Sequence, residues 1–142
     1  MAEDEMKLPA TVQSYFDVMR KLLPMESLGQ VVCDDATAEM VAGTDGKRSV
    51  AMACNGRAEI AEVIARRREA FAKLVIIPDI RSIAADAVEL SFLAEAQTAG
   101  DTDATYYDVV ARYHLHGGSM IHLVEIWTMR PKKRKRKGRQ GR

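Results

Sequence analysis

The stretch TYYDVVARYHLHGGSMIHLVEIWTM, residues 105–129, decides the fold, because two alternating runs flank a pair of glycines. Such alternation predicts β-strands whose successive side chains point to opposite faces of a sheet. Gly117-Gly118 between the runs predicts a hairpin. One face of the second strand then carries four side chains: Ile121, Leu123, Glu125 and Trp127. Three of the four favour burial, so Glu125 is either a solvated carboxylate at a sheet edge or a charge inside an apolar region.

Two runs upstream alternate in the same way, VIIPDIRSI at 75–83 and VELSFLAEAQT at 88–98. Their short connections can join only antiparallel neighbours, so the four strands form a meander. Earlier in the chain, apolar residues recur at helical spacing. The elements expected there are helices over 9–23 and 57–74, a shorter helical piece over 26–32, a strand over 37–41 and a turn over 43–46. The sequence therefore predicts an α+β fold with helices packed on one face of a curved antiparallel sheet.

Length and composition fit one domain. The chain has 142 residues, 47% hydrophobic and 29% charged, which suffices for one core. We expect this domain to span residues 9–130, after a flexible acidic N-terminus over residues 1–8. No apolar run approaches membrane-spanning length, and the acidic start lacks the pattern of a secretory signal. An intracellular protein, cytoplasmic or nuclear and without membrane contact, is the expectation.

Charge is unevenly distributed along the chain. Residues 1–130 hold 13 basic and 20 acidic side chains, whereas PKKRKRKGRQGR at the end holds eight basic and no acidic ones. A like-charged run without apolar residues cannot form a core, so residues 131–142 are expected to be a disordered basic tail. The run from Lys132 to Arg142 suits a nuclear import receptor or nucleic acid, while a merely solubilising tail is the alternative.

Five short strings, in this order, resemble the nuclear transport factor 2-like superfamily, which includes ketosteroid isomerases and SnoaL-like polyketide cyclases. They are VQSY at 12–15, DDATAE at 34–39, NGRAEI at 55–60, RSIAADA at 81–87 and ARYHLHGGSMIHL at 111–123. The resemblance covers about residues 10–130. It implies a cone-shaped domain that encloses an apolar pocket, commonly in a homodimer.

Ketosteroid isomerase chemistry carries over at one position only. Tyr15 matches the tyrosine that donates a hydrogen bond to the developing enolate oxygen. The place of the general-base aspartate is Met40, which cannot shuttle a proton, and the second oxyanion donor falls at Ala111 or Val110. The resemblance thus supports the pocket better than it supports steroid isomerisation.

Glu125 is the acid that the resemblance leaves in this pocket. Burial would raise its pKa, so that with Tyr15 it could transfer protons in an isomerase, dehydratase or cyclase reaction on a hydrophobic carbonyl compound. The expected catalytic residues are therefore Glu125 and Tyr15, and no cofactor or metal is expected. The expected substrate-binding residues are Trp127, Tyr113, Met40, Ala111, Leu123, Phe16 and Met19.

The direction of Glu125 depends on the hairpin register. A three-residue loop over 116–118 puts Val109 opposite Glu125 and keeps Tyr113 on its face. A two-residue turn puts Val110 opposite instead and makes Arg112 a diagonal neighbour, so that Glu125 becomes an ion-pair partner on the surface. Both registers stay open.

Several other residues invite a functional interpretation. His114 and His116 lie on one strand face, but a surface or subunit interface is favoured over a metal site. Cys33 and Cys54 have no metal-ligand spacing and are expected to be reduced thiols. Arg66, Arg67 and Arg68 are expected on a solvated helix face rather than at a phosphate site. The competing function is a non-catalytic interaction module with a vestigial pocket.

Overall fold

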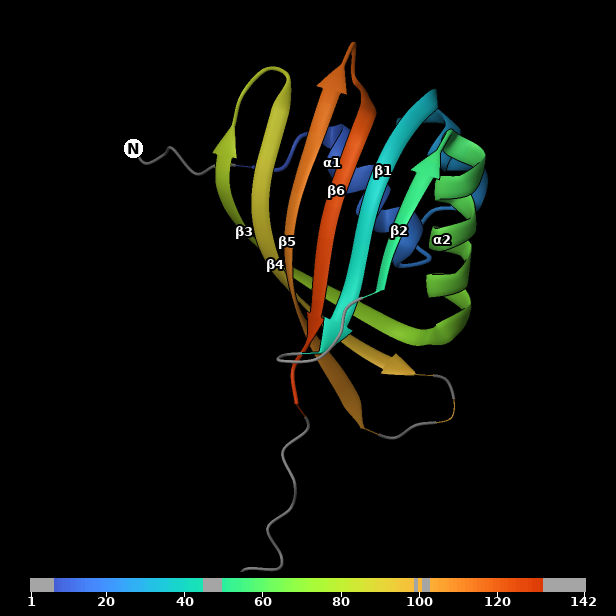
Figure 1. The fold of residues 1–142 in the computed structure, drawn as a ribbon, viewed down its shortest axis with the longest axis vertical. Coiled ribbons are helices and arrows are strands. Elements are labelled where there is room, and N and C mark those ends of the chain that lie inside the picture. The colour runs from blue at the N-terminus through green and yellow to red at the C-terminus, as the bar shows by residue number, and fades with distance from the viewer. Residues whose placement is uncertain (1–6, 45–49, 99, 101–102, 132–142) are drawn as a thin grey trace, which may run out of the picture.

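Six strands make one strongly curved sheet in the computed structural model, which describes residues 7–44, 50–98, 100 and 103–131. The strands lie in the order β2-β1-β6-β5-β4-β3 (Figure 1). Their bounds are β1 Val32–Thr44, β2 Val50–Asn55, β3 Phe71–Ile83, β4 Ala87–Thr98, β5 Ala104–His116 and β6 Ser119–Met129. The α+β class is confirmed. The sheet is mixed rather than purely antiparallel, because β1 runs parallel to β6.

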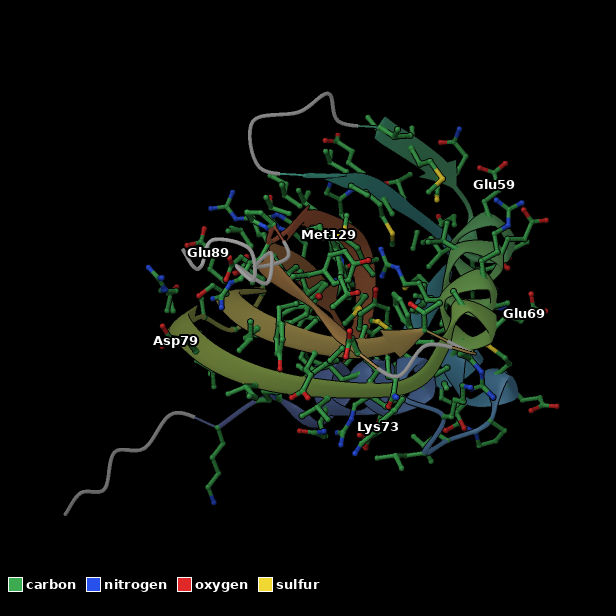
Figure 2. All side chains as sticks on the ribbon, turned by 90° about the horizontal axis from the view of Figure 1, so that it is seen from below. Glu59, Glu69, Lys73, Asp79, Glu89 and Met129 are labelled. Atoms are coloured by element: carbon green, nitrogen blue, oxygen red, sulfur yellow. The ribbon has the colours of Figure 1, made fainter. Side chains whose placement is uncertain are left out.

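Two helices cover one face and one edge of the sheet. α1 (Ala10–Met19) lies behind the sheet, and α2 (Arg57–Ala70) lies beside β2 and β1 (Figure 1). A short 3-10 helix, η1 (Met25–Gln30), connects α1 to β1. Seen from below, the sheet curls around an interior filled with side chains, while Glu59 and Glu69 point outward from α2 (Figure 2).

α1 is shorter than the predicted helix, which ran to Leu23. Lys21 adopts a left-handed backbone with φ of 69°, and the amide of Leu22 bonds the carbonyl of Asp17 at 2.7 Å. A left-handed residue just after the last turn is a common helix stop. The buried side of α1 nonetheless follows the predicted apolar spacing, with Tyr15, Phe16 and Met19 buried.

The second half of the predicted helix over 57–74 is partly strand. The backbone becomes extended at Phe71, with φ of −105° and ψ of 118°, and continues directly into β3. Phe71 and Leu74 therefore belong to β3. This strand carries the chain from the end of α2 to the opposite edge of the sheet (Figure 1).

The region before α2 differs most from expectation. β1 has 13 residues where a strand over 37–41 was expected, and β2 was not expected at all. Only one residue of β2 is buried, so its sequence lacks the alternation that marks a half-buried strand. Of the predicted turn over 43–46, Gly43 and Thr44 belong to β1 and the rest lies outside the described residues.

The hairpin between β5 and β6 combines a two-residue turn with a β-bulge. His116 pairs with Ser119, and both Gly117 and Gly118 have positive φ, as a type I′ turn requires. The pairing then shifts by one residue between His114 and Leu115, which leaves Ile121 without a direct partner.

Neither predicted register is therefore correct. Ala111, rather than Val109 or Val110, lies opposite Glu125. Because the bulge adds one residue, Glu125 shares its face with Tyr113, as in the three-residue alternative. Ile121, which was expected to point inward, is 41% exposed, and Met120 is buried in its place.

No helix in the described part of the chain is long and apolar enough to cross a membrane. Residues 1–6 and 132–142 lie outside the described residues. The predictions of an acidic flexible N-terminus and a basic tail fall almost entirely on these two segments.

Candidate functional site

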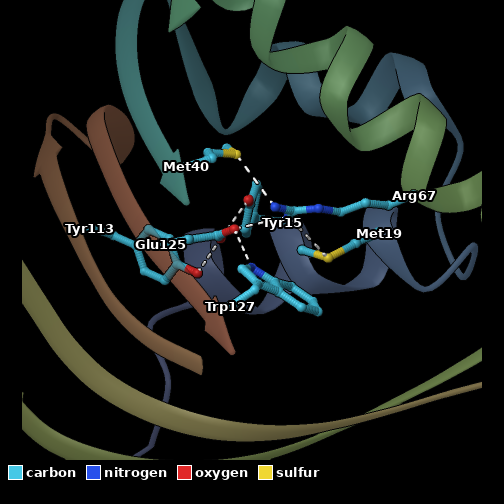
Figure 3. A network of polar contacts seen from close by, with 7 residues as sticks. All are labelled: Tyr15, Met19, Met40, Arg67, Tyr113, Glu125 and Trp127. Carbon is cyan, nitrogen blue, oxygen red and sulfur yellow. Dashed lines mark hydrogen bonds and ion pairs between the residues drawn. The ribbon is translucent and has the colours of Figure 1, made fainter. Parts of the chain in front are cut away.

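Glu125 lies fully buried at the centre of a network of polar contacts (Figure 3). One carboxylate oxygen, Oε2, accepts hydrogen bonds from the hydroxyls of Tyr15 at 2.7 Å and Tyr113 at 2.6 Å. The other, Oε1, accepts from Nη1 of Arg67 at 2.8 Å and from Nε1 of Trp127 at 3.0 Å. Each oxygen thus accepts two hydrogen bonds. A buried charge needs such partners, because it has lost the hydrogen bonds of water.

Four elements bring these donors together. Tyr15 comes from α1, Arg67 from α2, Tyr113 from β5 and Trp127 from β6. Trp127 lies two residues after Glu125 in the same strand, so pleating places both on one face. Tyr113 lies on that face of the neighbouring strand, where it pairs with Leu123. Sequence reasoning assigned Glu125 and Tyr15 to one apolar pocket, and the structure places them within hydrogen-bond distance.

Arg67 is the member of the network that sequence reasoning missed. It was expected on a solvated helix face, but its side chain is 15% exposed and forms an ion pair with Glu125. The guanidinium also lies over the indole of Trp127, 4.5 Å from the ring centroid, at a cation–π distance. The sequence held a signal for this, because a carboxylate in an apolar strand needs a cation and three arginines follow one another in α2.

Arg68 also departs from the expectation of a solvated face. Its Nη1 donates to the carbonyls of Val18 and Leu23, both at 2.9 Å. Val18 lies in the last turn of α1, where its carbonyl also accepts from the amide of Lys21 at 3.1 Å, and Leu23 follows the helix, so Arg68 links α2 to the end of α1. Arg66 alone of the three arginines is exposed as predicted.

The network keeps Glu125 ionised. Burial opposes its ionisation, but the charge of Arg67 and the hydrogen bonds from Tyr113, Tyr15 and Trp127 hold the pKa of this carboxyl below its ordinary value. The expectation of a raised pKa is therefore wrong, because it considered burial without the cation. Burial, with the negative charge of Glu125, raises the pKa of Tyr15 and of Tyr113 well above the ordinary value, so both phenols remain neutral donors.

The predicted lining residues surround this network. Met40 and Met19 direct their sulfur atoms at Arg67, with Sδ 3.5 Å from Nη2 and 3.8 Å from Nη1 respectively. Phe16 packs edge-on against Tyr113. Ala111 and Leu123 are buried beside Glu125 and Tyr113. These side chains pack against one another in the buried core, and an enclosed cavity among them stays a prediction.

The surface interpretation of Glu125 is wrong, because Arg112 has another partner. Arg112 forms an ion pair with Glu89 on the outer face of the sheet, where the two residues oppose each other across β4 and β5. An open hollow of about 430 Å³ on that face is lined by Arg112, Glu89, Val110, Val124 and Ile126, among others.

The histidines form no metal centre within the described residues. His114 and His122 oppose each other across β5 and β6, with ring centroids 5.9 Å apart. Nδ1 of His122 lies 2.6 Å from Oγ1 of Thr37, so this ring is occupied by a hydroxyl partner. Cys33 and Cys54 are free thiols, and burial raises the pKa of Cys54, which disfavours its thiolate.

Comparison with known proteins gives structural neighbours without close relatives in sequence. No known family profile and no curated protein sequence matches the chain. Among solved structures, a protein with a ketosteroid isomerase-like fold from Catenulispora acidiphila, bound to trimethylamine, has a TM-score of 0.68 at 13% identity and covers 86% of this chain and 88% of its own. The chain has the nuclear transport factor 2-like fold.

Two neighbours of this fold are described as enzymes. IdmH from Streptomyces antibioticus, provisionally a polyketide cyclase, has a TM-score of 0.64 at 14% identity and covers 85% of this chain and 92% of its own. SalBIII, an epoxide hydrolase/cyclase-like enzyme of pyran ring formation in the polyether salinomycin, has a TM-score of 0.61 at 18% identity and covers 83% and 88%. At these identities the likeness establishes the fold, and the chemistry has to be argued from the site.

Proposed function

We propose that the chain binds a small, largely apolar carbonyl compound and transfers a proton on it, in a reaction of the isomerase, dehydratase or cyclase type. The observation that carries the proposal is the buried pair of Glu125 and Tyr15, whose oxygen atoms lie 2.7 Å apart. An ionised carboxylate is in the form that accepts a proton, and a neutral phenol is in the form that donates a hydrogen bond. The neighbours described as cyclases lend support at the level of the fold.

In the proposed step Glu125 acts as the general base. Its carboxylate takes a proton from the carbon next to the carbonyl, and the electron pair of the broken C–H bond moves through the carbon framework to the carbonyl oxygen. Tyr15 donates a hydrogen bond to the resulting enolate oxygen. Protonation of the enolate by the Glu125 carboxyl then regenerates the carboxylate. Steroid isomerisation is not proposed, because Met40 and Ala111 stand where that reaction's other two groups would be.

Exchange of ketone α-protons in D2O tests this proposal without knowledge of the natural product. We expect the protein to speed deuterium incorporation into 2-decalone, followed by mass spectrometry. Glu125→Gln should reduce exchange to the buffer rate, and Tyr15→Phe should reduce it by about 100-fold, the usual effect of losing one oxyanion donor. Glu39→Gln and Tyr106→Phe are matched controls on exposed residues and should exchange like the wild type.

Undiminished exchange in Glu125→Gln would reject Glu125 as the base. Binding of the ketone by the wild type without any acceleration of exchange would reject the proton transfer while leaving a binding domain.

A second function is favoured by the saturation of Glu125. Four donors occupy both of its oxygens and Met40 is buried beside the cation, which is also how a structural charge is held. The chain would then be a non-catalytic interaction module, and Lys132 to Arg142 would bind a nuclear import receptor or nucleic acid. Removal of residues 131–142 should then abolish nuclear accumulation of a fluorescent fusion or binding to duplex RNA, and ketone exchange should be absent.

A homodimer is part of both proposals. Sedimentation analysis of the purified chain should give twice the 15.8 kDa mass of one copy.

A further inference from the structure

Glu125 can act as a base only if one of its four donors leaves, because both of its oxygens are occupied. Three of the donors are rings fixed by packing. Tyr15 and Tyr113 meet edge-on at 5.5 Å between ring centroids, and Trp127 packs against Phe92 at 5.6 Å. Moving any of these rings would open the core, whereas the O–H of Tyr15 can turn toward the enolate oxygen, with its ring in place, once the negative charge has moved there. The fourth donor, Arg67, sits on a long flexible side chain and is the most exposed member of the network.

The remaining contacts of Arg67 are weak ones. Within the described part of the chain, its other side-chain hydrogen bonds go to the sulfur atoms of Met40, at 3.5 Å, and Met19, at 3.8 Å. A thioether is a poor acceptor compared with a carbonyl oxygen, so a guanidinium held by two of them retains donor capacity. The cation–π attraction of Trp127 acts across the face of its indole ring and is not directed at a single atom. Arg67 can therefore move along the indole without losing this attraction.

Building on the proposed function, we propose that Arg67 is the displaceable partner of Glu125. A carbonyl ligand entering beside Trp127 takes the guanidinium onto its own oxygen and frees Oε1 of Glu125 to accept the proton. When the C–H bond breaks, the proton passes to Oε1 and the electron pair ends on the carbonyl oxygen as an enolate. The negative charge thus moves from Glu125 to the ligand oxygen, where Arg67 already lies and pairs with it. Arg67 is then both the positioning residue for Glu125 and a donor to the ligand.

Charge balance sets the class of ligand. In the free protein Arg67 and Glu125 neutralise each other, and a buried charge without a partner is costly. A ketone, aldehyde, ester or lactone adds an acceptor oxygen without adding charge. A carboxylate would place a second anion beside Glu125 with one cation for both. The network should therefore select neutral carbonyl compounds over acids of the same shape.

Displacement of Arg67 would also strengthen Glu125 as a base. Among the described residues that contact this carboxylate, Arg67 from α2 carries the positive charge. The other three donors are neutral: the phenols of Tyr15 from α1 and Tyr113 from β5, and the indole of Trp127 from β6. β1 contributes Met40, which does not ionise. Without the cation the effect of burial prevails, and the pKa of Glu125 rises.

Titration of Glu125 by carboxyl 13C NMR, with binding followed through Trp127, tests this inference. Trp127 is the one tryptophan of the chain, so its fluorescence reports events beside Arg67 directly. The probes are 2-decalone, decalin and decalin-2-carboxylate, which share a ring system and differ in the oxygen they offer. We expect 2-decalone to raise the titration midpoint of Glu125 by about one pH unit or more, as loss of a neighbouring opposite charge does. Decalin should leave the midpoint unchanged, and the carboxylate should bind at least about ten times more weakly than the ketone.

Two variants give matched controls. Arg67→Met should raise the midpoint without any ligand and abolish the further effect of 2-decalone. Arg66→Met removes an exposed charge from the same helix and should behave like the wild type. Should Arg67→Met fail to fold, the comparison of 2-decalone with decalin in the wild type still decides the question.

The outcomes separate the two proposals. A ketone that changes Trp127 fluorescence but leaves the midpoint unchanged shows that Arg67 stays on Glu125, which overturns the displacement and leaves the binding function intact. Equal affinity for the ketone and the carboxylate overturns the charge argument. Absence of any ketone binding overturns the proposed function and, with it, this inference.

Discussion

Two pairs of glutamate and arginine lie on opposite faces of the same sheet, and their surroundings give them different properties. Glu125 is fully buried on the inner face with Arg67, whereas the side chains of Glu89 and Arg112 on the outer face are 41% and 53% exposed. The outer pair joins residues that oppose each other across neighbouring strands. The inner pair joins a strand to a helix 58 residues away in sequence and adds three further donors. Burial and the number of donors, rather than residue type, separate an inner site from a surface contact.

The largest difference should appear when each glutamate is truncated. Glu125→Ala leaves a buried guanidinium, two phenols and an indole N–H without their acceptor and should lower the free energy of unfolding by about 3–5 kcal/mol. Glu89→Ala removes one partner of an exposed pair and should change it by less than about 1 kcal/mol. Urea unfolding followed by circular dichroism measures both values. Equal losses in the two variants would remove the distinction between the faces.

Removal of a single phenolic hydroxyl should give a smaller difference. Tyr113→Phe deletes one hydrogen bond to a buried carboxylate and should cost about 1.5–3 kcal/mol, the range for bonds to charged groups. Tyr106→Phe removes the same atom from a 40% exposed residue and should be nearly neutral. Thermal unfolding of the two variants side by side gives the comparison. A neutral Tyr113→Phe would mean that the other three donors hold Glu125 without it.

The pH dependence of stability should show the smallest difference between the faces. The pKa of Glu125 is lower in the folded chain than in the unfolded one, so its contribution to stability is complete above the unfolded pKa and is lost as the pH falls through the folded pKa. Glu125→Gln should therefore flatten the loss of stability below about pH 4.3, the ordinary pKa of a glutamate. Glu89→Gln, on the outer face of the sheet, serves as the control for the loss of one carboxylate. Parallel curves for all three proteins would show that Glu125 is not held ionised by the fold.

Alternation of residue types was enough to predict most of the sheet. The strands β4, β5 and β6 bury alternate side chains, and their predicted ranges differ from the observed ones by a residue or less at each end. β2 is exposed along most of its length and so leaves no such pattern. Phe71 and Leu74 fit a helical stripe equally well, and the chain becomes strand there because β3 pairs with β4. Local spacing cannot report such long-range pairing.

The site was predictable in part for the same reason. Glu125 and Tyr15 follow from alternation and from the resemblance in VQSY, and they lie together. The register at Glu125 could not be read from the sequence, because a bulge at Ile121 compensates for the two-residue turn. The ionisation of Glu125 depends on Arg67, which reaches it from another element. Burial predicted from one strand therefore gave the wrong direction for its pKa.

The central claim is that the fold holds Glu125 as an ionised carboxylate inside the core. Carboxyl 13C NMR of the ligand-free wild-type protein, with Glu125→Gln to assign the resonance, tests it most directly. The account predicts that Glu125 titrates below the ordinary value of a glutamate side chain. A midpoint above that value would mean that the carboxyl is neutral at its buried position and would contradict the account.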